Sequence, residues 1–235
     1  SLELKLGRAY IANGDYATAL VMYQDIYNRS TNDYLKAQMD LLIGQAYIAI
    51  GQNEQGYAAY LDAVENYPMA YDSYTALVEL VNAGYAVNEF DRGLVDYYAG
   101  EYGVAFAAFD RYLQTSGGAE AGGDSEAIAK AHYYRGMILR QRGEYEAAIA
   151  EWDIIIEDFS QSTVWVDAWE RNPEWPPDHI LAIKELRRPR TFEATEEGVR
   201  KALEYVETEF PSFTETMWVS KSIPIYVAHE LGIMK

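Results

Sequence analysis

The chain repeats one four-residue signature four times, always with gaps of seven, five and four residues between its members. The copies are Gly7/Gly14/Ala19/Tyr23, Gly44/Gly51/Gly56/Tyr60, Gly93/Gly100/Ala105/Phe109 and Gly136/Gly143/Ala148/Trp152. We interpret the first glycine of each copy as the place where two helices approach closely, and the second as the end of the first helix. The small residue then lies where the helices cross, and the aromatic residue fills the space beside it. The pattern predicts a repeated hairpin of two helices.

The signature resembles the tetratricopeptide repeat, and the first copy carries most of that motif. It contains Leu6 and Gly7, then Tyr10, then Asn13, Gly14, Asp15 and Tyr16, and finally Ala19 and Tyr23. The third copy departs from the motif at Asp96, where a large side chain is expected, and this predicts a shifted first helix. The resemblance implies an all-α fold, a right-handed superhelical solenoid of antiparallel helix hairpins. Neither helix of such a hairpin can bury its apolar stripe alone, so neighbouring hairpins stack and share one core.

The spacing of the copies predicts extra material between the repeats, because the first glycines are farther apart than the family's period of about 34 residues. Residues 73–81 carry apolar side chains at helical spacing and predict one additional helix. The glycine-rich residues 117–125 predict a flexible loop that ends at a helix N-cap. We therefore predict two parts. Residues 1–159 form the superhelix, with four repeats and one extra helix, and residues 160–235 form a degenerate helical repeat with capping helices.

Composition and charge narrow the range of functions. The chain has no cysteine, which excludes disulfides, thiolate metal ligands and cysteine nucleophiles. Its formal net charge of −18 argues against nucleic acid as a partner, because it repels phosphate backbones at long range. No apolar run approaches the roughly 20 residues of a membrane span, so no integral membrane segment is expected. The sequence indicates neither a compartment nor an oligomeric state, and a bacterial cell-envelope location follows if an export signal was trimmed before Ser1.

The residues do not assemble a recognisable catalytic motif. His132, His179 and His229 are scattered without a second histidine one helical turn away, so they are interpreted as structural residues rather than metal ligands. The glycine-rich loop lacks the Gly-Lys-Ser/Thr ending of a phosphate-binding loop. Carboxylate pairs are abundant, but a chain this acidic places them on solvated helix faces. We therefore predict a protein that is not an enzyme and that has no catalytic residue, metal or cofactor.

Residues 92–170 also resemble the helical scaffold region of bacterial soluble lytic transglycosylases. The stretches that carry this resemblance are 92–102, 108–113, 131–136 and 148–153. Those enzymes cleave peptidoglycan with a glutamate, usually followed by serine, in a separate lysozyme-like domain, and this chain contains no Glu-Ser pair. The resemblance therefore implies, as an alternative function, the non-catalytic superhelical portion of a lytic transglycosylase-like envelope protein.

The resemblance to tetratricopeptide domains also implies a binding surface. In that family, partners bind a concave groove that is formed mainly by the first helix of each hairpin, around the signature glycine. The corresponding groove positions in this chain are Arg8, Gln45, Leu94, Tyr97, Tyr98, Tyr133, Met137 and Arg140. The family's clamp for a C-terminal carboxylate is absent, because it needs asparagine and a basic residue at successive positions. The leading prediction is a non-catalytic protein-protein interaction scaffold that binds a peptide or protein segment in this groove.

The sequence leaves two questions open, the role of three tyrosines and the role of the chain as a whole. Tyr97, Tyr98 and Tyr133 stand outside the signature, and their amphipathic rings suit either a partner interface or packing between helices. The chain as a whole suits either an interaction module or a structural scaffold for oligomerisation.

Overall fold

The computed structural model describes residues 2–116 and 124–172, together with the isolated positions 197, 200, 201, 204 and 208. Within these residues the chain forms α-helices and no strand, which confirms the predicted all-α fold for this part of the chain. The helices are α1 (Leu2–Ala12), α2 (Tyr16–Arg29), α3 (Asp33–Ala49), α4 (Asn53–Asn66), α5 (Tyr71–Asn82), α6 (Glu89–Tyr98), α7 (Tyr102–Ser116), α8 (Ser125–Gln141), α9 (Tyr145–Asp158) and α10 (Trp165–Arg171). The chain divides into two compact units, unit 1 over Ser1–Gly118 and unit 2 over Ala119–Lys235.

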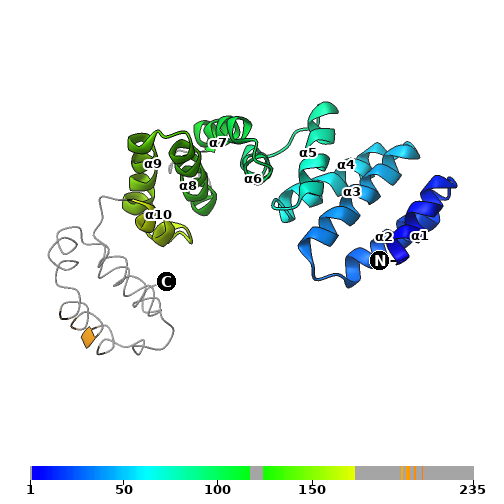
Figure 1. Cartoon of the computed structure of the whole chain (residues 1–235), viewed down its shortest axis with the longest axis horizontal. Helices are drawn as coiled ribbons and strands as arrows, with labels where there is room; N and C mark the ends of the chain where they lie inside the picture. The colour runs from blue at the N-terminus through cyan, green and yellow to red at the C-terminus, as the bar shows by residue number, and fades with distance from the viewer. Residues whose placement is uncertain are drawn as a thin grey trace. The chain divides into compact units, whose positions relative to one another are not determined.

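Unit 1 contains three helix hairpins and one helix without a hairpin partner (Figure 1). Helix α1 packs against α2, α3 against α4, and α6 against α7, while α2 and α3 join the first two hairpins. Helix α5 packs against α3 and α4 and also touches α6. The extra helix predicted over residues 73–81 is therefore confirmed as α5.

The second glycine of the signature forms the turn of each hairpin. Gly51 follows α3 with a φ of 79°, a left-handed conformation that side chains with a Cβ rarely adopt. The next residue, Gln52, donates its backbone N–H to the carbonyl oxygen of Tyr47 at 2.9 Å, which closes the end of the helix. The other three turns have the same positive φ at Gly14, Gly100 and Gly143. The predicted role of this glycine is confirmed in all four hairpins.

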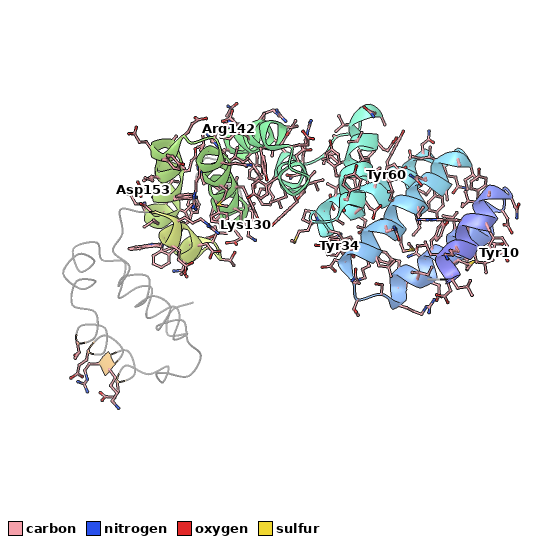
Figure 2. All side chains as sticks on the ribbon, viewed as in Figure 1. Tyr10, Tyr34, Tyr60, Lys130, Arg142 and Asp153 are labelled. Atoms are coloured by element: carbon pink, nitrogen blue, oxygen red, sulfur yellow. The ribbon has the colours of Figure 1, made fainter. Side chains whose placement is uncertain are left out.

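The first glycine of the signature lies directly against the aromatic residue of the same copy. A Cβ placed on Gly7 would lie 2.5 Å from Cε1 of Tyr23, and one placed on Gly93 would lie 2.5 Å from Cε1 of Phe109. The same contact joins Gly44 to Tyr60 and Gly136 to Trp152. All four rings are buried, and Figure 2 shows Tyr60 among the side chains of unit 1. Because only glycine leaves room for the ring, the pair sets how closely the two helices approach.

The core of unit 1 continues from one hairpin to the next. Between α2 and α3, Tyr23 and Ile26 pack with Met39 and Ile43. Farther along the chain, a second cluster contains Tyr60 with Val64 of α4, Leu77 with Leu80 of α5, and Val95 of α6. Each fully buried aliphatic or aromatic side chain contributes about 1.5–3 kcal/mol, so the stacked hairpins depend on each other for stability.

Unit 2 contains the hairpin of α8 and α9, followed by α10, which packs against α9 (Figure 1). Trp152 of α9 and both tryptophans of α10, Trp165 and Trp169, are buried. Trp165 donates its indole N–H to the carbonyl oxygen of Ile156 at 3.0 Å. Helix α10 was not predicted from the sequence. It occupies residues just before Pro173, in the segment rich in tryptophan and proline.

The predicted division at residue 159 stays a prediction, because most of residues 160–235 lie outside the described part of the chain. The predicted loop at 117–125 also lies largely outside it. The N-cap that follows this loop is Asp124, whose side chain accepts a hydrogen bond from the backbone N–H of Glu126 at 3.0 Å. Ser125 is therefore the first residue of α8 rather than its cap.

A half-buried ion cluster joins α8 and α9, and it supports a first prediction. Oε2 of Glu151 lies 2.7 Å from Nδ1 of His132, and its Oε1 lies 3.0 Å from Nη2 of Arg135. Glu151→Gln keeps the shape but removes the charge, so we expect it to lower the free energy of unfolding of unit 2 by about 1–2 kcal/mol. Urea unfolding followed by tryptophan fluorescence measures this, because every tryptophan of the chain lies in unit 2. The control is Glu157→Gln at an exposed position of α9, and equal effects of the two variants would contradict a stabilising role for the cluster.

Candidate functional site

A depression of about 180 Å³ lies between the first helices of the first two hairpins, α1 and α3, and residues of α2 also line it. It is lined by Arg8, Ile11, Tyr16, Tyr23, Leu42, Gln45, Ala46 and Ala49. Helical spacing explains this grouping, since residues three and four apart share one face of a helix. Arg8 and Ile11 are such a pair on α1, and four of the α3 residues follow the same rule. The two predicted groove residues of unit 1's first hairpins, Arg8 and Gln45, therefore lie in one depression.

Arg8 provides the positive charge of this surface. Its side chain is exposed, and among the described residues no carboxylate forms an ion pair with it. Burial raises the pKa of Asp72, at the start of α5, and the positive charge of Arg8 offsets part of that increase. Arg8 also opposes the increase in the pKa of Tyr23 that burial causes. Because no carboxylate of the described residues forms an ion pair with it, the guanidinium of Arg8 can form a hydrogen bond with an acidic or carbonyl group of a partner.

The predicted residues on α6 form a separate aromatic group within unit 1. Leu94 and Tyr97 are half-buried, and Tyr98 is 39% exposed. The ring of Tyr97 packs edge-on against Tyr98 and against Tyr102, each with a centroid distance of 5.5 Å. None of these residues lines the depression between α1 and α3. The ring of Tyr97 is thus in contact with two neighbouring rings, whereas Tyr98 presents part of its ring to solvent.

The remaining predicted residues lie on α8 in unit 2. Tyr133 is only 8% exposed, and its hydroxyl accepts a hydrogen bond from Nε of Arg171 at 2.7 Å. The guanidinium carbon of Arg171 also lies 5.6 Å from the centre of the Tyr133 ring. Met137 is half-buried and Arg140 is exposed. Of this group, Arg140 is the side chain most accessible to a partner.

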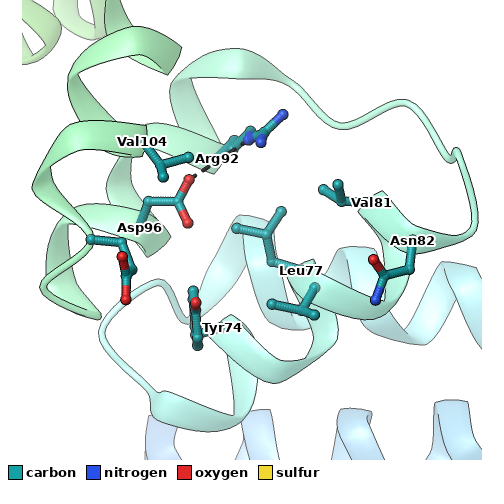
Figure 3. A pocket seen from close by; sticks show the side chains of 9 residues that line it. Tyr74, Leu77, Val81, Asn82, Arg92, Asp96 and Val104 are labelled. Carbon is teal, nitrogen blue, oxygen red and sulfur yellow. Dashed lines mark ion pairs between the residues drawn. The ribbon is translucent and has the colours of Figure 1, made fainter.

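A second surface was missed by the sequence analysis. It is a notch of about 160 Å³ within unit 1, lined by Tyr74, Leu77, Val78, Val81, Asn82, Arg92, Asp96, Glu101 and Val104 (Figure 3). Asp96 is buried, and its Oδ2 lies 3.6 Å from Nε of Arg92, one helical turn earlier. The sequence offered one signal for this notch. Asp96 stands where the repeat motif has a large side chain, and Arg92 precedes it by four residues. The sequence alone could not show that α5 forms the other wall.

The described residues contain no group of three or more histidine, aspartate or glutamate side chains placed to hold a metal ion. His132 is engaged with Glu151, while His179 and His229 lie outside the described residues. None of the described helices is both long enough and apolar enough to cross a membrane.

Comparison with known proteins identifies the repeats. The family model described as tetratricopeptide repeat matches residues 2–32, 39–68 and 130–162. The first stretch contains the hairpin α1/α2, whereas the second begins within α3 and contains α4, and the third begins within α8 and contains α9. A search of curated proteins and a search of solved structures found no match. The resemblance of residues 92–170 to lytic transglycosylases therefore stays a prediction.

The hairpin α6/α7 keeps the same architecture, with Gly93 against Phe109 and a left-handed Gly100 at the turn. Three observations support the same family: the match to the family model, the repeated contact between glycine and aromatic residue, and the packing of consecutive helices. The chain contains tetratricopeptide repeats at residues 2–32, 39–68 and 130–162.

Proposed function

We propose that this chain is a non-catalytic scaffold that binds an extended or helical segment of a partner protein along the first helices of its hairpins. Tetratricopeptide repeats generally mediate protein-protein interaction, which supports a protein partner. The observation that carries the proposal is the depression between α1 and α3, which is lined by Arg8 and Gln45 together with apolar and aromatic side chains. Tyr98 and Arg140 are further candidate contacts in their own units.

The chemistry of the depression suits one apolar side chain and one acidic or carbonyl contact. Ile11, Leu42 and Ala49 offer apolar surface, and the arginine donates charge-assisted hydrogen bonds. The amide of Gln45 both donates and accepts, so it can pair with the backbone of a bound segment. A volume of about 180 Å³ is below the roughly 300–1,000 Å³ of small-molecule pockets, which favours a side chain of a peptide over a metabolite.

The proposal is tested by selecting peptides from a phage-displayed library of random 16-residue sequences on the full chain. We expect the enriched peptides to combine an aliphatic or aromatic residue with an acidic one. The double variant Arg8→Ala/Gln45→Ala is expected to weaken their binding by about tenfold or more, because it removes both polar contacts of the depression. Fluorescence anisotropy with a labelled peptide measures the dissociation constant.

The matched control is Lys5→Ala/Gln55→Ala, which removes one cation and one amide from exposed positions outside the depression. The control variant is expected to bind the peptides like the wild type. Circular dichroism must show the same helicity and melting temperature for all three proteins. A library that yields no binder, or peptides that bind the two double variants equally well, would count against the proposal.

A further inference from the structure

Among the helices described in unit 1, α5 is the one that has no hairpin partner. Its inner face is fixed to the preceding hairpin, because the hydroxyl of Ser73 donates to the carbonyl oxygens of Ala63 at 2.9 Å and Tyr67 at 2.7 Å. Leu77 and Leu80 complete this attachment in the core. After α5 the chain passes directly into α6, which pairs with α7 instead. One flank of α5 is therefore left without the second helix that covers the first helix of every other hairpin.

This flank is apolar and open. Tyr74, Val78 and Val81 are spaced four and three residues apart, so they form one stripe along α5. Val78 is 39% exposed and Val81 is 40% exposed. Val104 of α7, also 40% exposed, faces the stripe across the notch (Figure 3). The three exposed valines around this notch of about 160 Å³ form an apolar binding site for an aliphatic side chain.

The floor of the notch carries an incompletely satisfied charge. Asp96 is 4% exposed, and neither its Oδ2 nor the facing Nε of Arg92 has a hydrogen-bond partner. Their separation of 3.6 Å is too long for a good hydrogen bond, so the carboxylate is desolvated without full compensation. Burial raises the pKa of Asp96 to about 6, and Arg92 limits that increase, which leaves the carboxylate mostly ionised at neutral pH. A cation brought to this carboxylate through the notch would offset part of this penalty.

Charge around the notch favours a cationic donor. The exposed Glu101 lies at the notch beside Asp96, so two carboxylates face one arginine there. The whole chain carries a formal net charge of −18, which attracts a basic partner from a distance. The surrounding apolar stripe would exclude water from a contact made at the floor, and this strengthens a charge-assisted hydrogen bond.

We propose that the notch docks a basic amphipathic helix of a partner protein, which packs its apolar ridge on Val78 and Val104 and directs a lysine or arginine to Asp96. The docked helix covers the flank of α5 that lacks a hairpin partner. Its contacts follow the helix-in-groove mode, with anchors one turn apart. This surface does not include Arg8 or Gln45, so it stands independently of the function proposed above.

The test uses a phage-displayed library built on a helical 16-residue peptide, selected on the full wild-type chain. Enriched peptides are expected to carry lysine or arginine within one turn of a pair of aliphatic residues. Binding is measured by fluorescence anisotropy. We expect Asp96→Asn to weaken binding about tenfold, and Val78→Ser/Val104→Ser to weaken it by a similar factor. The control Val21→Ser changes an exposed valine on α2 and is expected to leave binding unchanged.

Two further variants keep the test decisive. If Asp96→Asn lowers the melting temperature, the exposed Glu101→Gln replaces it, with an expected loss of about threefold in affinity. The double variant Arg8→Ala/Gln45→Ala is expected to bind these peptides like the wild type. Failure to enrich basic peptides, or binding that survives the changes at Asp96, Glu101 and the two valines, would overturn the proposal. Peptides lost only with Arg8 and Gln45 would support the groove between α1 and α3 and exclude the notch.

Discussion

Gly44→Ala is expected to lower the free energy of unfolding of unit 1 by about 2–3 kcal/mol, because it overpacks the closest helix contact of the second repeat. The added Cβ would collide with the ring of Tyr60 and lie 3.0 Å from the carbonyl oxygen of Gly56. Tyr60 is buried and the second neighbour is backbone, so neither can move aside at low cost. Urea unfolding of the full chain, followed by far-ultraviolet circular dichroism, measures the change. Hydrogen exchange of amides in α3 and α4 locates it.

The matched control is Gly103→Ala in the first turn of α7. No atom lies within 4 Å of the position that its Cβ would take, and its φ is not positive. The substitution is therefore expected to raise stability by about 0.5–1 kcal/mol, since alanine favours helix more than glycine does. The packing of Gly44 against Tyr60 predicts that the free energy of unfolding changes in opposite directions in the two variants. Equal changes would mean that the contact between Gly44 and Tyr60 does not limit the size of the residue at position 44.

The second large effect is a dependence of stability on pH that comes from Asp40. This side chain of α3 is buried, and burial raises its pKa to about 8, with a further contribution from the nearby carboxylate of Asp62. Between about pH 4 and pH 8 the folded protein therefore keeps a proton that the unfolded chain has lost. Because the folded protein binds this proton more tightly, the free energy of unfolding falls as pH rises across this window. The contribution of Asp40 is fully lost above its folded-state pKa. The positive charge of Lys36 offsets only part of it.

Asp40→Asn should remove this dependence, because the amide keeps the shape and the donor of a protonated carboxyl group without ionising. We expect the variant to match the wild type near pH 4 and to be more stable by about 2 kcal/mol at pH 8. Urea unfolding at several pH values measures the difference between the two proteins. Asp33→Asn, at an exposed position of the same helix, is the control and should show no growing difference. A constant offset between Asp40→Asn and wild type at all pH values would contradict the assignment.

The repeats were predictable because their chemistry is local. A glycine, a turn glycine, a small residue and an aromatic residue at fixed spacing determine one hairpin, whatever lies elsewhere in the chain. Helix α5 was predictable for a similar reason, since Tyr74, Leu77, Val78 and Val81 follow helical spacing. Helix α10 was missed because it is only seven residues long, and the nearby prolines suggested a break.

The polar sites depend on contacts between distant residues and could not be predicted from periodicity. Asp40 meets Asp62 only when α3 packs on α4, and Asp96 enters a notch only because α5 lies opposite it. Tyr133 was predicted to have either a groove role or a packing role. Its hydrogen bond to Arg171, far along the chain, favours the packing role. Arg8 and Gln45 occupy equivalent positions of successive repeats, and both line the same depression.

The geometry of each hairpin depends on a size-matched pair, formed by the first glycine and the aromatic residue of its repeat. A double-mutant cycle on Gly44 and Tyr60 tests it most directly. Tyr60→Leu shortens the side chain that Gly44→Ala would strike, so the double variant should be more stable than the sum of the single effects by about 1–2 kcal/mol. Urea unfolding of the four proteins gives this coupling energy. Strictly additive effects would show that the two residues do not constrain each other, and would contradict the account.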